Sequence, residues 1–379
     1  MSGLMKSRKK LFLVVSICVS ALLSLSSVSS LSLAAPNTAS DPALNPGLEA
    51  AVSKLEADGF KGLVLAAHGD QVLLEKVVGE PQTGQPALSK DSVFRYASIT
   101  KLFTSVMVMQ QVDAGKLALD MPLGKFWPDF PNEAARAITL RQLMLHMSGL
   151  ANPDKLPQFY FARTPASGDM QLNATTVCAA PLQRAPGEAF DYNNCDFIVL
   201  GALLEKVTGI KYQKLLQQKI FNPAKMTHSG MYSPPNYDDL SHVHGIVSGN
   251  PEIPINFASY GAAGATFGTL RDLLAFDQAF SRGRLLSPAS RAEMVKPNAV
   301  GGALGVWSYP FSAKADKPAS MIVERQGWIG GIRTLNLVDI KNEAYLIMIS
   351  TNGDVDLSQT WANKGPAAGL LQATLLAIP

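Results

Sequence analysis

Ser98 and Lys101 stand three residues apart at the start of a segment, residues 98–115, whose apolar side chains repeat with the spacing of a buried helix. A helix places both side chains on one face, one turn apart. A serine hydroxyl is too weak an acid to attack unaided, but a desolvated lysine with a lowered pKa could accept its proton. The pair could therefore supply a nucleophile and a base without histidine. The alternative is a serine that caps the helix beside a solvated lysine.

This spacing is weak evidence alone, because Ser7 and Lys10 fit it as well. A first companion is Tyr192-Asn-Asn194, which follows Pro186-Gly187. A phenol beside a lysine ammonium can have its pKa lowered enough to relay protons, and the Asn194 amide can donate and accept hydrogen bonds. The alternative is a turn after Pro-Gly.

A second companion is the segment 324–331, Glu-Arg-Gln-Gly-Trp-Ile-Gly-Gly, which lies between two expected strands. Gly327 permits a close backbone approach to a ligand, and Arg325 offers a fixed positive charge for a carboxylate. The alternative is a glycine-rich turn with a surface arginine.

The elements that must position these residues form strands at both ends of the chain and helices between them. Residues 62–67 and 71–78 predict a β-hairpin, and four further strands are expected near the C-terminus. The pattern indicates an α+β fold, with an antiparallel sheet flanked by helices and built from both termini, and an inserted, mostly helical domain. We expect the sheet domain to comprise residues 36–120 and 265–379, and the helical domain residues 121–264.

Charge gives little evidence for a nucleic-acid partner. The chain of 379 residues carries 33 Lys and Arg against 30 Asp and Glu, a net charge of +3, but four of the basic residues lie within the first ten. They precede an apolar run and small residues, a pattern typical of a secretory signal peptide over residues 1–35. Without it the net charge is −1, so we expect no nucleic-acid binding. We expect an exported protein, periplasmic or extracellular, with no stable membrane span after cleavage; the alternative is an uncleaved anchor.

Two cysteines remain outside this segment, Cys178 and Cys195. In an oxidising compartment they could form one disulfide, and two buried free thiols are the alternative. Histidines without acidic or cysteine companions give no metal pattern, so we expect neither a metal nor a cofactor.

Taken together, the ordered motifs resemble those of the beta-lactamase-related serine hydrolases, which comprise class C beta-lactamases, DD-peptidases and related esterases. The likeness spans nearly all of the chain after residue 35. It rests on five blocks in the family's order: residues 94–105 around Ser98, 139–150 around His146, 186–194, 261–272 and 325–327.

The resemblance implies a role for each site residue. Ser98 would be the acylated nucleophile, Lys101 its proton acceptor, and Tyr192 the group that relays protons to the leaving group and activates water. Asn194 would bind the acyl-side amide of the substrate and orient Lys101. The backbone N–H groups of Ser98 and Trp328 would form the oxyanion hole, and His146 would be structural.

The third motif departs from the family pattern. Arg325 and Gln326 stand where the family has a lysine or histidine and a small hydroxyl residue, with Gly327 retained and Trp328 adding bulk. We expect Arg325, Gln326 and Gly327 to contact substrate. The resemblance implies a site between the two domains, with a small-molecule or peptide substrate. The predicted function is a secreted serine hydrolase that acts on an ester or a D-amino-acid amide. The alternatives are a beta-lactamase or DD-carboxypeptidase, and a catalytically impaired penicillin-binding-type protein; the oligomeric state is not predicted.

Overall fold

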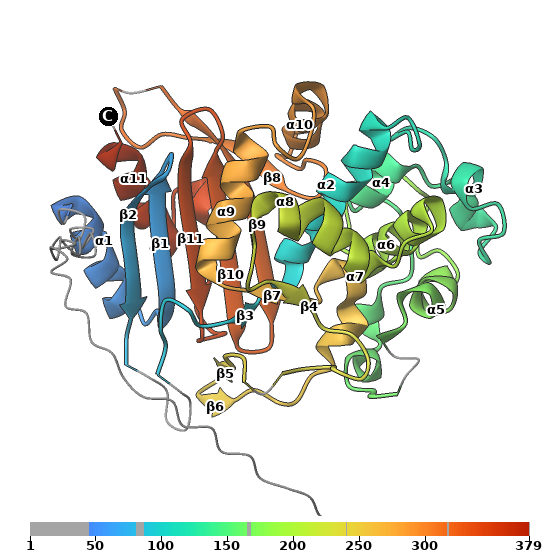
Figure 1. The fold of residues 1–379 in the computed structure, drawn as a ribbon, viewed down its shortest axis with the longest axis horizontal. Helices are drawn as coiled ribbons and strands as arrows, with labels where there is room; N and C mark the ends of the chain where they lie inside the picture. The colour runs from blue at the N-terminus through green and yellow to red at the C-terminus, as the bar shows by residue number, and fades with distance from the viewer. Residues whose placement is uncertain (1–44, 81–86, 165–167, 240, 317, 379) are drawn as a thin grey trace, which may run out of the picture. The chain divides into compact units, whose positions relative to one another are not determined.

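The computed structural model describes residues 45–80, 87–164, 168–239, 241–316 and 318–378. The predicted signal peptide lies outside these ranges. The main sheet has six strands in the order β2-β1-β11-β10-β9-β8, and every neighbouring pair is antiparallel (Figure 1). Its strands are β1 (Gly62–His68), β2 (Gln71–Val78), β8 (Trp307–Phe311), β9 (Ser320–Ile329), β10 (Ile332–Asp339) and β11 (Ala344–Ser350).

Both ends of the chain contribute to this sheet. The β1–β2 hairpin comes from the N-terminal part, and β1 continues the sheet by pairing with β11, so that Gly62 lies opposite Ser350. The α+β fold class, with an antiparallel sheet built from both ends, is thus confirmed. Two small sheets complete the strands: β3 (Phe94–Arg95), β7 (Thr266–Gly268) and β4 (Gly230–Met231) in one, and β5 (Ile246–Val247) with β6 (Asn250–Pro251) in the other.

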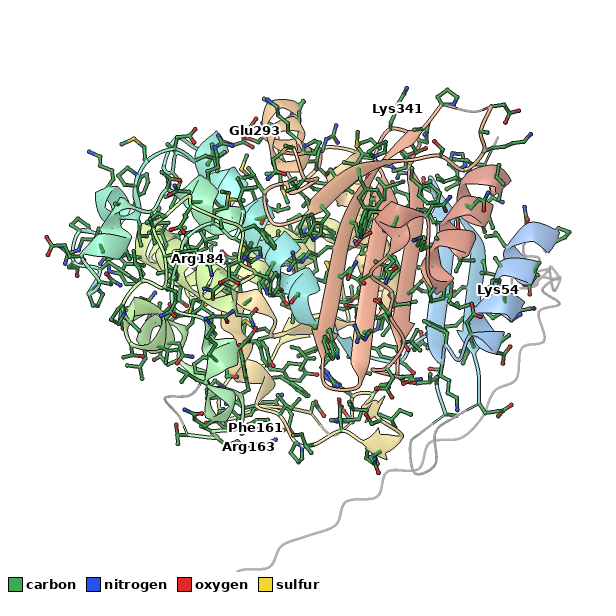
Figure 2. The ribbon with its side chains drawn as sticks, turned by 180° about the vertical axis from the view of Figure 1, so that it is seen from behind. Lys54, Phe161, Arg163, Arg184, Glu293 and Lys341 are labelled. Atoms are coloured by element: carbon green, nitrogen blue, oxygen red, sulfur yellow. A yellow bond between two sulfur atoms is a disulfide. The ribbon has the colours of Figure 1, made fainter. Side chains whose placement is uncertain are left out.

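The main sheet is covered by helices on both faces, and its inner strands β1 and β11 are almost continuously apolar. Helices α1 (Pro46–Ala57) and α11 (Pro366–Ala377) bury Leu48, Val52 and Leu371 against one face. Helix α9 (Leu270–Ser281) lies against the other face, which belongs to the larger core. Figure 1 shows α9 in front of the sheet, and Figure 2, viewed from behind, shows α1 and α11 on the opposite side.

The remaining helices come mainly from the middle of the chain, as the sequence predicts. The described part of the chain contains no helix that is long and apolar enough to cross a membrane. The division into domains 36–120 with 265–379 and 121–264 stays a prediction. The helices are α2 (Thr100–Asp113), α3 (Leu123–Phe126), α4 (Leu140–Met144), α5 (Met170–Thr175), α6 (Asn194–Thr208), α7 (Tyr212–Leu216), α8 (Asn222–Ala224) and α10 (Pro288–Val295).

Helix α2 is the buried helix that carries Lys101. Its side chains are buried around nearly the whole circumference, which explains why the predicted apolar stripe is so broad. Ser98 lies in the 3₁₀ turn Ala97–Ile99 that leads into the helix. The helix ends where predicted, since Gly115 adopts a left-handed φ of 67° just beyond it.

Strand β9 is longer than the sequence pattern indicates. The predicted strand stopped near residue 324, but the ladder with β10 continues through Gly327, which pairs with Thr334, to Ile329. Strand β8 pairs with β9 only as far as Glu324, opposite Trp307. The last residues of β9 therefore have no strand of the main sheet on that side, within the described residues.

Cys178 and Cys195 form a disulfide across 17 residues. Both residues are fully buried. Of the two alternatives left open by the sequence, the structure shows the disulfide, which ties the start of α6 to the preceding loop.

We expect the variant Cys178→Ala/Cys195→Ala to lose about 3 kcal/mol of unfolding free energy, because a cross-link of this span restricts the unfolded chain by that amount. Urea unfolding measures the loss. The single variant Cys178→Ala is the matched comparison and should lose a similar amount, since either change breaks the bond. A double variant within about 0.5 kcal/mol of the wild type would contradict this account.

Candidate active site

Ser98, Lys101 and Tyr192 converge at the junction of α2, α6 and β9. The Ser98 Oγ lies 2.6 Å from the Tyr192 hydroxyl and 3.1 Å from Lys101 Nζ. The turn that presents Ser98 is strained, because Ala97 has a positive φ of 49° without being glycine. Thr100 Oγ1 donates to the Ala97 carbonyl at 2.7 Å and holds this turn. The serine hydroxyl is thus presented to two groups that can exchange protons with it.

Lys101 is completely buried. Its Nζ donates to Asn194 Oδ1 at 2.7 Å and to the Ala263 carbonyl at 2.8 Å. These two acceptors can hold both hydrogens of a neutral amine, which directs the remaining lone pair toward Ser98. Burial, with the nearby Arg325 charge, lowers the pKa of Lys101 to about 8 although Tyr192 opposes the shift. The neutral amine is therefore accessible near neutral pH.

Asn194 is held by two residues that the sequence analysis did not single out. Its Nδ2 donates to Asp154 Oδ1 at 3.1 Å and to the Tyr160 hydroxyl at 3.0 Å, so its Oδ1 must face Lys101. Asp154 and Tyr160 lie in two short 3₁₀ turns, Pro153–Lys155 and Pro157–Tyr160. Turns this short have no periodic pattern, and no sequence signal points to the two residues. Lys101 and Asn194 are thus in contact, and the role of Asn194 in orienting Lys101 stays a prediction.

Arg325, which the sequence analysis expects to face a substrate carboxylate, lies beside the nucleophile. The residue is 4% exposed, and its guanidinium donates to protein oxygens. The Nε contacts the Ser98 carbonyl at 2.8 Å, Nη2 the Tyr192 hydroxyl at 3.0 Å and Nη1 the Gly305 carbonyl at 3.3 Å. All three nitrogens are engaged with protein acceptors beside the nucleophile, and Arg325 also lines the cavity that contains Ser98. Its contact with substrate stays a prediction.

The two cations that flank Tyr192 change its acidity. Burial alone would raise the pKa of this phenol, but the positive charges of Lys101 and Arg325 outweigh it and lower the pKa below 10. Lys101 Nζ also lies 4.9 Å from the centre of the Tyr192 ring. Tyr192 can therefore hold or release a proton beside Ser98.

His146 and Asp196 pack behind Tyr192 as a buried, neutral pair. The Asn193 N–H donates to His146 Nδ1 at 3.3 Å, so this nitrogen is an acceptor, and Asp196 Oδ2 at 2.8 Å must then carry a proton. The pKa shifts of the two residues agree with a neutral pair, because burial raises the pKa of Asp196 and lowers that of His146. The His146 ring lies 4.5 Å from the Tyr192 ring and supports it.

Gly327 brings β9 against the nucleophile turn. A β-carbon at this position would lie 2.4 Å from the Tyr96 carbonyl oxygen and 3.0 Å from Ser98 N. The backbone that continues to Trp328 therefore passes close to the Ser98 N–H. The oxyanion hole expected from these two N–H groups stays a prediction. The Trp328 side chain points away, with its indole N–H donating to the Gly330 carbonyl at 2.8 Å.

Gln326 turns to the other face of β9, as strand alternation requires. Its amide nitrogen donates to Glu324 and, at 3.4 Å, to the Ser358 carbonyl. Gln326 nevertheless lines, with Ser98, Tyr192 and Asn194, a cavity of about 490 Å³.

The described residues hold no group of three or more His, Cys, Asp or Glu side chains arranged for a metal ion.

A sequence model of the beta-lactamase family matches residues 48–364. The chain belongs to this family. Among its relatives, penicillin-binding protein 4* of Bacillus subtilis (strain 168) is 25% identical over 319 residues, which cover 78% of this chain and 69% of that protein. Esterase EstB of Burkholderia gladioli is 29% identical over 184 residues, which cover 45% of this chain and 46% of that protein. Such relatives identify a serine hydrolase.

Solved structures support the fold. The D-amino acid amidase from Ochrobactrum anthropi SV3, complexed with L-phenylalanine amide, superimposes with a TM-score of 0.71 at 21% identity. The superposition covers 88% of this chain and 99% of that one. The main sheet and its covering helices are thus those of the beta-lactamase family.

We expect Gly327→Ala to lower the acylation rate at Ser98 by about 100-fold, because the methyl group must push β9 away from the nucleophile turn. Stopped-flow measurement with an activated ester tests this. The matched control is Gly369→Ala in α11, where a β-carbon has nothing within 4 Å. That variant should keep its activity and gain about 0.5–1 kcal/mol of stability. Equal rates in both variants would show that the close approach at Gly327 is dispensable.

Proposed function

We propose that this protein hydrolyses an ester or a D-amino-acid amide through an acyl-enzyme on Ser98. The observation that carries the proposal is the position of the Ser98 Oγ between Lys101 Nζ, at 3.1 Å, and the Tyr192 hydroxyl, at 2.6 Å. Nucleophilic catalysis needs such a base within hydrogen-bond reach.

In the acylation step the Ser98 oxygen attacks the substrate carbonyl carbon and its proton passes to neutral Lys101. Tyr192 gives its proton to the departing alcohol or amine. In deacylation a water molecule gives a proton to the Tyr192 phenolate and attacks the acyl carbon. Lys101 then returns its proton to Ser98, so that the starting protonation states are restored. Arg325 stabilises the phenolate through its 3.0 Å contact.

An ester or amide without a terminal carboxylate fits the cavity better than a beta-lactam or a D-Ala-D-Ala peptide does. Gln326 stands where the family has a small hydroxyl residue, which the resemblance implies helps to hold a substrate carboxylate, and its amide is engaged by the Glu324 carboxyl group. Burial raises the pKa of Glu324 to about 7, so above this pH a substrate carboxylate there would face a like charge, which costs binding energy.

Export is part of the proposal. The basic start, the apolar run and the small residues of segment 1–35 support a signal peptide and a periplasmic or extracellular location. The buried disulfide is consistent with an oxidising compartment.

Intact-mass measurement after incubation with p-nitrophenyl acetate and with benzylpenicillin tests the proposed reaction. We expect a transient acetyl adduct with fast turnover of the ester, a slow or absent penicillin adduct, and no adduct in Ser98→Ala. Fast penicillin turnover would favour the beta-lactamase alternative. Failure of both reagents to modify the wild type would favour the binding-protein alternative.

The pH dependence of acylation tests the base. Because Lys101 must be neutral and its pKa lies at about 8, kcat/KM should rise with pH through a midpoint near that value. Lys101→Ala should lower acylation by about 10²- to 10⁴-fold, whereas Lys116→Ala on the surface should not.

Loss of the positive charge in Arg325→Gln should move the rise of kcat/KM with pH to higher pH, because that charge lowers the pKa of Lys101. Arg325→Lys retains the charge and is the matched control. A Lys101→Ala variant with the wild-type rate would overturn the assignment of the base.

A further inference from the structure

A second cavity adjoins the active-site cavity and has no part in the reaction described above. Its volume is about 740 Å³. Both cavities are lined by Trp307, the first residue of β8, and by Gln326, which lies in the part of β9 that β8 does not pair with. The second cavity is therefore a direct neighbour of the cavity that contains Ser98.

The second cavity contains one carboxylate and no positive charge among the described residues that line it. Glu324 is 2% exposed, and its oxygens accept hydrogen bonds from the Tyr309 hydroxyl and the Gln326 amide. Within the described ranges it forms no ion pair. The adjacent Arg325 points to the opposite face of β9, toward the Ser98 carbonyl. A buried carboxylate without a cation partner is an attractive site for one.

The lining of this cavity includes three aromatic residues. Trp307, Tyr309 and Trp361 all line it, and Trp361 is 66% exposed. The faces of such rings attract cations, most of all ammonium groups that are only weakly hydrated. Burial raises the pKa of Glu324 to about 7, so the carboxylate is charged in mildly alkaline solution.

The position of the second cavity indicates which end of the substrate reaches it. Tyr192 is the proposed proton donor to the leaving group, and Arg325 joins Tyr192 to the part of β9 that bears Glu324 and Gln326. The leaving group is therefore placed beside Tyr192, in the cavity that Gln326 also lines. From Gly327, which touches the nucleophile turn, to Glu324 the strand advances about 10 Å.

We propose that the second cavity binds a positively charged ammonium group at the leaving-group end of the substrate, through Glu324 and the surrounding aromatic rings. This inference rests on the proposed function and specifies its substrate class: esters or amides whose departing alcohol or amine carries an ammonium group about 10 Å from the scissile bond.

A pair of acetate esters tests the proposal. One is 6-(trimethylammonio)hexyl acetate and the other is 7,7-dimethyloctyl acetate, its uncharged carbon analogue of the same shape. At about pH 8 the wild type should hydrolyse the charged ester with a kcat/KM at least roughly 10-fold higher, since one favourable charge contact has about that value. In Glu324→Gln the ratio of the two kcat/KM values should fall to near one, because only the value for the charged ester decreases. Glu56→Gln, an exposed acid on α1, is the matched control and should keep the preference.

Trp361→Ala provides a second variant, because Glu324 is buried and its replacement could impair folding. Trp361 is exposed, so its loss should leave the thermal midpoint unchanged and reduce the preference for the charged ester several-fold. Equal kcat/KM values for the two esters in the wild type, or an equal loss for both in Glu324→Gln, would overturn the cation site while leaving the serine hydrolase intact. Failure of both esters to acetylate Ser98 would instead contradict the proposed function.

Discussion

The buried amine of Lys101 is the constraint on which the site depends. A lysine without exposure to water is tolerated only if its hydrogens have acceptors, and the structure supplies Asn194 Oδ1 and the Ala263 carbonyl. Each acceptor comes from a different part of the chain, and Asn194 is fixed in turn by Asp154 and Tyr160. The hydrogen bonds that the Lys101 amine requires therefore hold α2, α6 and the segments around Asp154 and Ala263 in place beside Ser98.

The sheet contributes the other half of the constraint. Strand β9 must lie close enough to the Ser98 turn for Arg325 to reach the Ser98 carbonyl, and a glycine at position 327 allows that approach. Arg325 then places a second positive charge beside Tyr192. The helical layer and the sheet thus each deliver one cation to the same phenol, and the balance of these charges against burial decides where the shared protons reside.

Local sequence patterns predicted those parts of the molecule that depend on short-range spacing. The hairpin at residues 62–78, the helix that follows Ser98 and the glycine at its end are of this kind. The orientation of Arg325 could not be predicted, because it depends on which face of β9 meets the nucleophile turn, a matter of register between distant segments. Asp154 and Tyr160 were missed because such short turns carry no periodic signal. The cysteine pairing depended on a distance that only the fold supplies.

The two faces of strand β9 contact different parts of the molecule, and this difference bears on how the protein could evolve. Arg325 and Gly327 face the nucleophile, whereas Glu324 and Gln326 face the second cavity. Because side chains alternate along a strand, substitutions at Glu324 reach the wall of the second cavity without changing the residues that contact Ser98, whereas Gln326 lines both cavities. Substrate selectivity and catalysis therefore depend on different residues of the same short strand. Directed evolution can change the selectivity without changing the catalytic residues.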